Sequence, residues 1–382
     1  MLADNQLLPP EANFEIYVIP MVNPDGVIHG MARTNMAGLD LNRHWGENIL
    51  KAPNNKINVW LDCDPGLDDI LAIIYAAHCD RIDLIGISTS PGNSSLENTT
   101  RNALDMLYHI GRSDIQVYMG SNQLINGDMK LADHVHGENG LGGVHLKQSP
   151  RQAITEHGLQ KTYEKIMSTE GQVVWANTGS LTNLCILLLT YPKLKSKLKE
   201  IVIMGGAIGK GNTTPAAEFN IFFDPCAFKN VLKLKGDIPL VMIPLETTHI
   251  NIAGEDVYER FKGYSSHPFG LALYNTMLCY QDFYITVNKI PFPPYHDPLT
   301  IFYILHPEEF EVRPANVEVD THPGSYGRTN IYFSYPGVPR VSSSTLVTTN
   351  LLNEKTKFWD EMLRIMDMIF SPEMQKTIGI EY

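Results

Sequence analysis

The sequence predicts an α/β fold, an open and mostly parallel sheet with helices on both faces, preceded by a short, incomplete amino-terminal segment. The first observation behind this prediction is that short apolar runs alternate with segments of helical composition from residue 57 onward. Such alternation is typical of βαβ units, which build parallel sheets. The second is that polar clusters follow three of the expected strands, at 62–69, 92–93 and 178–180. Ligands bind beyond the carboxyl ends of strands in such sheets, so these clusters mark the expected site.

Each expected element depends on the length and composition of its run. Runs of four to six mostly apolar residues predict strands, and runs of nine or more residues between them predict helices. The expected strands are 57–61, 84–89, 173–177, 201–204 and 240–244, with further strands within 311–335. The expected helices are 69–79, 96–110, 181–189, 227–235 and a final amphipathic helix at 353–370.

Composition narrows the class of protein and its partners. The 382 residues are 43% hydrophobic and 19% charged, as in an ordinary globular protein, and their formal net charge is −12. This acidic balance argues against a nucleic-acid partner, because phosphates require a basic surface. The five cysteines show no CxxC spacing, which is typical of reduced thiols. With no secretory signal and no apolar run of about 18 residues, we expect a cytoplasmic protein without a membrane partner.

The most informative stretch, residues 62–69, packs four aspartates into eight residues. It lies between the first expected strand and the first expected helix. Four carboxylates that close repel one another, and such a cluster at a strand-to-helix junction indicates a bound hard cation. With a cation present, one carboxylate remains to transfer a proton. The stretch therefore predicts metal-assisted chemistry, carried by Asp62, Asp64, Asp68 and Asp69.

Two other interpretations of this stretch stay open on these residues alone. One is a turn at Pro65-Gly66 followed by Asp68 as a helix N-cap, which would explain one or two of the aspartates. The other is a Mg²⁺-dependent phosphatase of the haloacid-dehalogenase type, whose motif also places Asp-x-Asp after an apolar strand. That motif requires Thr or Val two residues after the second aspartate, whereas this chain continues with Pro65-Gly66 and an aspartate pair.

Motifs along most of the chain resemble the inosine–uridine-preferring nucleoside hydrolase family. The resemblance begins with the aspartate-rich stretch and covers residues 57–382. Each motif alone is short, but their order and spacing together are specific. They are Asp62–Asp69, Gly92-Asn93, Asn98–Leu104, His136–Gly143, Thr178–Asn183, Met204–Gly206, Glu218–Asn220, Asp224-Pro225 and His296–Pro298.

The resemblance implies an enzyme that hydrolyses the N-glycosidic bond of ribonucleosides to ribose and free base, in nucleoside salvage. The substrate would be of the uridine/inosine or pyrimidine type, because His296 resembles these branches of the family more than the purine-specific branch. A small-molecule ribonucleoside is then the expected ligand, and a homodimer or homotetramer the expected assembly. An alternative is a catalytically inactive module that binds nucleosides without turnover.

The resemblance also implies a calcium site. The positions that match the family's ligands are Asp64, Asp69, the main-chain carbonyl of Thr178, and Asp297. Oxygen-only ligands suit Ca²⁺ better than zinc. Asp64 is also the expected general base, because it would touch both the cation and the attacking water. Asp62 is expected to support these ligands.

The family's ribose-binding positions match four residues of this chain. The bond breaks through a ribosyl cation, so hydrogen bonds that tighten in that state would add to the rate. The matching residues are Asp68, Asn93, Glu218 and Asn220.

Two histidines and two tyrosines are expected near the base. His296 matches a family residue that protonates the departing base, a role worth roughly 10²–10⁴-fold. His136, in a glycine-rich loop, matches another histidine on the base side. Tyr280 and Tyr284 lie one helical turn apart and resemble aromatic positions over the base, although this spacing also fits a core stripe of a helix at 272–287.

The amino-terminal segment resembles a different family. Residues 13–45 look like the middle of a cytosolic zinc carboxypeptidase, in which the substrate carboxylate would be bound by Arg33, Asn42 and Arg43. The zinc-binding His-x-x-Glu of that family should precede this segment and is not found there. We therefore expect residues 1–50 to be a carboxypeptidase-like fragment without function, and residues 57–382 to form the hydrolase domain.

Overall fold

The structure is a computed structural model that describes residues 56–333, 345–352 and 357–382. The chain divides into two units, residues 1–55 and residues 56–382. The carboxypeptidase-like fragment expected at 1–50 therefore lies outside the described residues, and both its boundary and its lack of function stay predictions.

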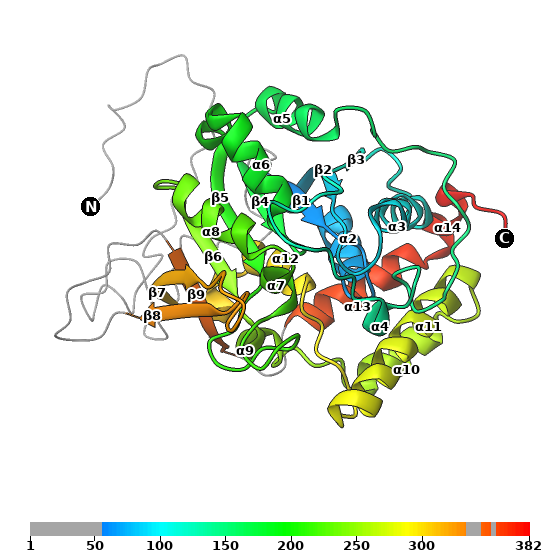
Figure 1. The fold of residues 1–382 in the computed structure, drawn as a ribbon. Helices are drawn as coiled ribbons and strands as arrows, with labels where there is room; N and C mark the ends of the chain where they lie inside the picture. The colour runs from blue at the N-terminus through cyan, green and yellow to red at the C-terminus, as the bar shows by residue number, and fades with distance from the viewer. Residues whose placement is uncertain (1–55, 334–344, 353–356) are drawn as a thin grey trace, which may run out of the picture. The chain divides into compact units, whose positions relative to one another are not determined.

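The second unit is built on a nine-stranded sheet with the strand order β3-β2-β1-β4-β5-β6-β9-β7-β8 (Figure 1). Neighbouring strands from β3 to β9 pair in parallel, and β7 and β8 add an antiparallel edge. The prediction of a mostly parallel sheet is confirmed. The strands are β1 (Ile57–Cys63), β2 (Ile82–Thr89), β3 (Val117–Met119), β4 (Val173–Asn177), β5 (Leu198–Met204), β6 (Leu240–Ile243), β7 (Phe310–Val319), β8 (Thr329–Phe333) and β9 (Thr345–Leu351).

Helices cover both faces of the sheet, as predicted (Figure 1). Side chains alternate along a strand, so Val59 and Leu61 of β1 enter one core and Trp60 enters the other. In the described part of the chain, no helix is long and apolar enough to span a membrane. The helices are α2 (Asp69–His78), α3 (Leu96–His109), α4 (Asp133–His136), α5 (Gly158–Ser168), α6 (Thr182–Thr190), α7 (Phe219–Phe223), α8 (Pro225–Leu234), α9 (Leu245–Thr248), α10 (Glu255–Gly263), α11 (Pro268–Phe283), α12 (Pro298–Leu305), α13 (Lys357–Ile369) and α14 (Pro372–Ile378), with short turns η1 (Pro192–Ser196), η2 (Tyr284–Asn288) and η3 (Pro307–Glu309).

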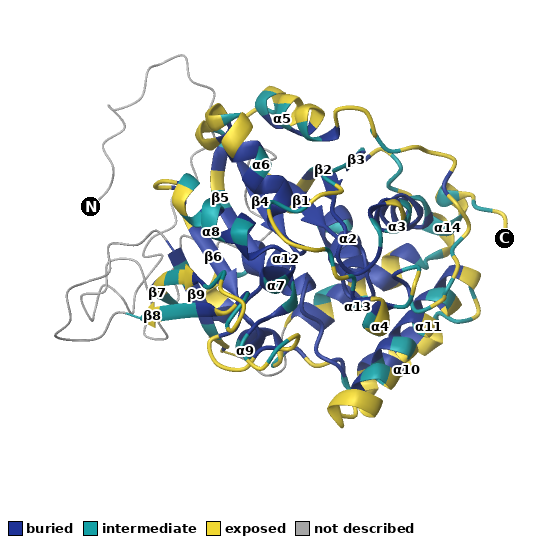
Figure 2. Cartoon of the chain, in the orientation of Figure 1, coloured by how far each residue is buried: buried dark blue, intermediate teal, exposed yellow. Residues whose placement is uncertain are grey.

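The first strand carries the aspartates into the interior of the protein. β1 has a neighbour on each side, and residues 59–77 are all buried. A continuous buried run of this kind is typical of a strand that is covered on both faces. Figure 2 shows the central strands of the sheet in the buried colour, whereas β7, β8 and the outer surfaces of the helices are partly exposed. Because 62–69 lies within the buried run, its carboxylates are enclosed by protein.

The strand order collects the expected polar segments at one edge of the sheet. β2, β1, β4 and β5 are consecutive neighbours that all run in the same direction. The segments that follow them contain Asn93, Asp64, Thr178 and Gly205, respectively. Since the carboxyl ends of parallel strands meet at the same edge, residues far apart in the chain are brought into one region.

Candidate active site

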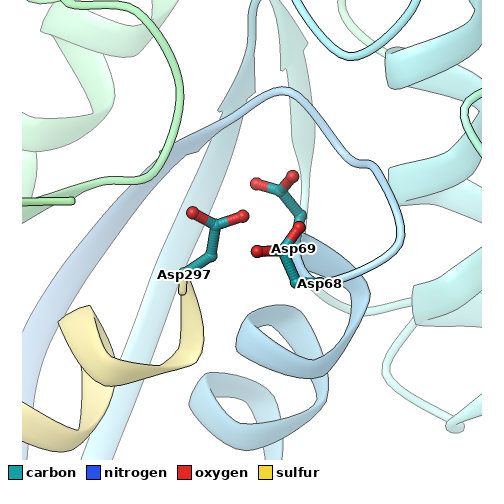
Figure 3. A group of neighbouring side chains, drawn as sticks. All are labelled: Asp68, Asp69 and Asp297. Atoms are coloured by element: carbon teal, nitrogen blue, oxygen red, sulfur yellow. The ribbon is translucent and has the colours of Figure 1, made fainter. Parts of the chain in front are cut away.

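Three buried carboxylates face one another at the amino-terminal ends of two helices (Figure 3). Asp68 is the N-cap residue of α2, Asp69 is the first residue of α2, and Asp297 is the N-cap residue of α12. One oxygen atom of each carboxylate lies within 4.8 Å of the others. The positive ends of both helix dipoles lie here and favour negative charge. The arrangement is a candidate cation site whose ligands are all oxygen atoms.

Asp64 interacts with this group but is not a member of it. Its Oδ2 atom accepts a hydrogen bond from the backbone N–H of Asn93 at 2.9 Å. Its Oδ1 atom is buried and has no hydrogen-bond partner among the described residues. The carboxylate fits in this position only because residues 92 and 179 are glycines. A Cβ at Gly92 would lie 2.1 Å from Oδ2, and a Cβ at Gly179 would lie 2.6 Å from Oδ1. Asp64 is thus confined to one position with one oxygen atom uncommitted.

Hydrogen bonds connect Asp69 to residues that follow other strands. Its Oδ2 atom accepts from the backbone N–H of Gly66 at 3.0 Å and from Asn93 Nδ2 at 2.9 Å. Its Oδ1 atom accepts from Thr178 Oγ1 at 2.8 Å. The carbonyl of Thr178 accepts from Asn220 Nδ2 at 2.8 Å and keeps a second lone pair for another partner. Residues that follow β1, β2, β4 and β5 therefore form one polar network.

Within residues 56–333, 345–352 and 357–382, no positive side chain compensates these carboxylates. In the described part of the chain none of them forms an ion pair with lysine, arginine or histidine. Burial raises the pKa of Asp62 and of Asp68 to about 7. Burial and neighbouring carboxylates raise the pKa of Asp64 and of Asp297 well above the ordinary range. A hard cation would let these groups ionise together, and the all-oxygen donor set fits such an ion.

A cavity of about 460 Å³ lies against this group. Part of its lining offers carboxylate, amide and hydroxyl groups, and the rest offers aromatic and apolar surface with histidines. Its size and mixed lining suit a small molecule with a polar part and a flat apolar part. The polar residues include Asp68, Asn93, Thr178, Glu218, Asn220 and Asp297, and the others include Val135, His136, Tyr280, Phe283, Tyr284 and His296.

The cavity brings together most of the residues that the sequence places in the site. Every expected substrate-binding residue lines it, together with Thr178, His296 and Asp297. Asp64 and Asp69 do not belong to the lining. They contribute through the network that they form with Asn93.

Glu218 and Asn220 are held in place by backbone groups. Glu218 is the N-cap residue of α7, and its carboxylate accepts from three backbone N–H groups, including those of Gly206 and Asn220, at 2.8–3.1 Å. Burial raises the pKa of Glu218 to about 7. Asn220 donates from Nδ2 to the carbonyls of Thr178 and Met204, at 2.8 and 3.2 Å. These bonds leave the side-chain oxygen of Asn220 for a ligand.

Two lining residues, Asn212 and Thr213, belong to no recognised motif and were not predicted, and a third, Phe219, lies within the Glu218–Asn220 motif but had no predicted role. Asn212 and Thr213 lie in the loop between β5 and α7. The loop turns back on itself, so their backbone N–H groups both donate to the carbonyl of Ala217, at 3.2 and 3.1 Å. Asn212 Oδ1 accepts from the backbone N–H of Phe219 at 2.9 Å. The sequence signal was the length and glycine content of this connection, which is typical of a functional loop.

His136 is a neutral imidazole whose Nδ1 atom accepts a hydrogen bond from the backbone. Its Nδ1 atom accepts from the backbone N–H of Leu67 at 3.0 Å, so the ring proton lies on Nε2. Burial, with His134 nearby, lowers the pKa of His136 to about 3. Gly66 permits this close approach, because a Cβ there would lie 2.5 Å from Nδ1.

His296 lies between two hydroxyl groups. Its Nδ1 atom is 2.7 Å from Thr248 Oγ1, and its Nε2 atom is 2.9 Å from the hydroxyl of Tyr284. Because Thr248 Oγ1 donates to the carbonyl of Leu245 at 3.2 Å, it accepts from Nδ1, and Tyr284 then donates to Nε2. Burial and the neighbouring His249 lower the pKa of His296 well below its ordinary value. Thr248 was not placed in the site on sequence grounds, and no local motif indicates it.

Tyr280 and Tyr284 agree with both interpretations of their spacing. They line the cavity, and they also belong to the hydrophobic core that contains α11. Their ring centroids lie 5.1 Å apart in an edge-to-face arrangement, and the ring of Tyr280 lies 6.1 Å from that of His136. The inner face of α11 is therefore core and cavity wall at the same time.

Asp62 makes its contacts within the protein and is not part of the cavity lining. Its Oδ2 atom accepts from Ser88 Oγ and from Asn183 Nδ2, the latter at 3.0 Å. Its backbone carbonyl accepts from the backbone N–H of Thr178 at 2.8 Å. These bonds are compatible with the expected supporting role, which stays a prediction.

Comparisons with known sequences identify two families along the chain. The sequence model of the inosine-uridine preferring nucleoside hydrolases matches residues 59–359, and that of the zinc carboxypeptidases matches residues 11–60. The pyrimidine-specific ribonucleoside hydrolase RihA of Shewanella woodyi is 40% identical over 269 residues, which cover 68% of this chain and 83% of the relative. RihA of Escherichia coli is 36% identical over 318 residues, covering 79% and 98%. Both resemblances seen in the sequence are confirmed.

Solved structures support the same assignment. The purine-preferring ribonucleoside hydrolase from Gardnerella vaginalis superposes with a TM-score of 0.74 at 27% identity, covering 82% of this chain and 98% of that one. The plant nucleoside hydrolase PpNRh1 superposes with a TM-score of 0.73 at 26% identity, covering 83% and 99%. The family match spans most of the described unit and includes every expected residue of the site. The chain therefore belongs to the family of inosine-uridine preferring nucleoside hydrolases.

Proposed function

We propose that this protein hydrolyses pyrimidine ribonucleosides to ribose and free base, with calcium as its cofactor. The observation that carries the proposal is a buried carboxylate group against a cavity that combines fixed polar groups with aromatic side chains. Relatives at 36–40% identity are named pyrimidine-specific ribonucleoside hydrolases, which supports the choice of base. Uridine and cytidine are the expected substrates, and inosine is the purine nucleoside to compare with them. The homodimer or homotetramer and the cytoplasmic location stay predictions.

The ribose would be bound by groups whose positions the protein has already fixed. Asp68, Asn93, Glu218 and Asn220 all line the cavity, and the last three make hydrogen bonds that orient them. Orientation before binding matters because hydrogen bonds that strengthen as charge develops on the sugar lower the barrier directly. The fixed arrangement therefore supports recognition of a hydroxyl-rich sugar.

Hydrolysis requires two proton transfers. The hydroxyl group of water is added to the anomeric carbon, so one proton must leave the water and one must reach the departing base. Asp64 is the proposed acceptor of the first proton, because its Oδ1 atom is buried and uncommitted. The pair formed by Tyr284 and His296 is the proposed source of the second. The carboxylates of Asp68 and Asp297, which line the cavity, would stabilise the ribosyl cation between the two transfers.

Calcium would be held by Asp64, Asp69, Asp297 and the carbonyl of Thr178. Every one of these donors is an oxygen atom, and the two aspartates at helix N-termini lie in the group of three carboxylates. Bound there, the ion would polarise a water molecule and the ribose hydroxyls and offset the repulsion among the carboxylates. Asp68, the third member of the group, is the proposed link between this site and the ribose.

A panel of nucleosides tests the proposal. Uridine, cytidine, inosine and adenosine are incubated with the purified protein, and the released base is measured by chromatography. We expect release from uridine and cytidine, loss of release in EDTA, and recovery when calcium is added back. Release of phosphate from phosphate esters with Mg²⁺ would favour the phosphatase alternative. If the folded, calcium-loaded protein releases no base from any of the four, the proposed activity is wrong.

The protonation state of His136 gives a pH prediction. Burial lowers its pKa to about 3, so the side chain stays neutral throughout the pH range of the assay. The contribution of His136 should therefore be independent of pH, and His136→Gln should lower kcat/KM for uridine by the same factor from about pH 5.5 to 8. The measurement is a pair of pH–rate profiles at saturating calcium. A factor that changes with a midpoint near 6.5, the ordinary histidine pKa, would contradict it.

A further inference from the structure

The two helices that carry the carboxylate group begin at the group and run away from it together. α2 begins at Asp69, α12 begins directly after Asp297, and the two helices pack against each other. Figure 3 shows both helices leaving the carboxylates on the same side. An α-helix is rigid along its axis, so a shift of one helix along the other would change the separation of the two carboxylates. Contacts at the far ends of the helices can therefore control the group.

Glu361 of α13 contacts both helices at their far ends. Its Oε2 atom accepts a hydrogen bond from the hydroxyl of Tyr75, in the last turn of α2, at 2.5 Å. Its Oε1 atom lies 3.1 Å from Nε2 of His306, the C-cap residue of α12. At 1.5 Å per residue, these contacts lie roughly 9–14 Å along the helices from Asp69 and Asp297. We call this arrangement the Tyr75–Glu361–His306 clasp.

The side chains of the clasp are largely enclosed by protein, and their contacts favour a charged pair. Tyr75 is fully buried, and the side chains of His306 and Glu361 are 12% and 20% exposed. The hydrogen bond with Glu361 raises the pKa of His306. Although burial opposes it, the pKa of Glu361 is lowered by its bonds with His306 and Tyr75. Both directions favour an imidazolium–carboxylate pair, and a charge-assisted bond shielded from water is stronger than an exposed ion pair.

Other contacts of α13 provide both support and a control. The ring of Phe358 lies edge-on to Tyr75 of α2, with centroids 5.5 Å apart, and 6.0 Å from Phe302 of α12. Aromatic packing thus holds the same two helices from the same side. A second ion pair, Lys357 with Glu309, joins α13 to η3. Like the clasp it is an ion pair made by α13, but this ion pair ends on η3 and not on α2 or α12.

We propose that Glu361 is a positioning residue for the cation site, which keeps Asp69 and Asp297 together by holding α2 and α12 at their far ends. The inference depends on the proposed cation site, but it concerns residues that do not touch that site. Residues that orient metal ligands from outside typically change metal affinity about 10–100-fold. Glu361 acts through two helices, so the lower end of this range, about tenfold, is expected for its removal.

Calcium titration of the full chain tests the proposal. Isothermal titration calorimetry on the calcium-free protein gives the dissociation constant of wild type, Glu361→Ala, Tyr75→Phe and Glu309→Gln, and thermal unfolding gives their stability. We expect a dissociation constant about tenfold weaker in Glu361→Ala, a smaller change in the same direction in Tyr75→Phe, and wild-type affinity in Glu309→Gln. At saturating calcium, kcat for uridine in the first two variants should recover towards the wild-type value.

Each outcome separates this inference from the proposed cofactor. If the wild-type protein binds no calcium, the proposed cofactor is wrong and the inference with it. If the wild type binds calcium and both clasp variants bind it equally well, the positioning role alone is wrong, whatever their stability. An equal loss of affinity in Glu309→Gln would also overturn it, because the effect would then be general. Tyr75→Phe removes only a hydroxyl group, so it carries the test if Glu361→Ala does not fold.

Discussion

Asp64→Asn is expected to lower kcat for uridine by roughly 10²–10⁴-fold, the usual effect of losing a general base, with little change in KM. Asparagine has the same shape, and its side-chain oxygen can still accept the bond from the backbone N–H of Asn93. The atom that replaces Oδ1 would be an amide nitrogen, which cannot accept a proton. The variant should therefore keep its fold and lose the proton acceptor. Steady-state kinetics over a range of calcium concentrations separates this loss from weaker calcium binding.

Gly92→Ala tests the position of the Asp64 carboxylate, because this substitution displaces the carboxylate without removing it. A Cβ at position 92 would lie 2.1 Å from Oδ2 of Asp64, so the carboxylate must move. We expect a loss of kcat similar to that of Asp64→Asn. Gly263→Ala is the matched control, since a Cβ there meets nothing within 4 Å. A loss of less than about tenfold in Asp64→Asn would lie below the usual range for a general base and would assign this role to another residue.

Features with a local signal could be predicted from the sequence. The aspartate-rich stretch combines four carboxylates with a strand before it and a helix after it, and each of these signals lies within a few residues. The position of the site followed from one further rule, that consecutive parallel strands end at the same edge of a sheet. That rule does not apply to the antiparallel edge formed by β7 and β8. For this region only the presence of strands was predicted.

Features that depend on contacts between distant segments could not be predicted. Thr248 forms a hydrogen bond with His296, which lies 48 residues further along the sequence. The sequence next to Thr248 forms only the short helix α9. Asn212 reaches the cavity because its loop turns back on the carbonyl of Ala217. The grouping of Asp68 with Asp297 depends on how α2 and α12 pack. In each case the deciding quantity is a distance that the local pattern of residues does not contain.

The aspartates that resemble the family's calcium ligands differ by one residue from the three that lie together in the structure. The residues that resemble the family's calcium ligands include Asp64, whereas the three carboxylates gathered within 4.8 Å include Asp68 instead. Asp64 is confined by Gly92 and Gly179 and keeps one free oxygen atom. A bound cation could draw on that atom without any movement of the glycines. The expected roles of Asp64 and Asp68 are therefore compatible with the observed positions.

Asp297→Asn is expected to make the calcium-free protein more stable while it removes a proposed calcium ligand. Burial and the neighbouring Asp68 and Asp69 raise the pKa of Asp297 well above its ordinary value. The folded protein therefore keeps this proton at a pH where the unfolded chain has released it, above about pH 4. Stability contributed by this group falls as the pH rises from that value towards the raised pKa. Asparagine does not titrate in this range, so the stability of the variant relative to wild type should increase between about pH 5 and pH 8.

With calcium present, the wild-type protein should instead be more stable than Asp297→Asn. A ligand present at about 100 times its dissociation constant stabilises the folded state by roughly 2.7 kcal/mol, and only the protein with the complete site gains this amount. Thermal unfolding with EDTA and with calcium measures both states, and about 1 kcal/mol corresponds to a shift in Tm of roughly 2–4 °C in domains of 150–250 residues. Asp83→Asn, at an exposed position, is the matched control and should leave both values unchanged. A variant that is less stable than wild type without calcium would show that the repulsion among these carboxylates is already relieved within the protein, and the main physical argument for a cation at this site would fail.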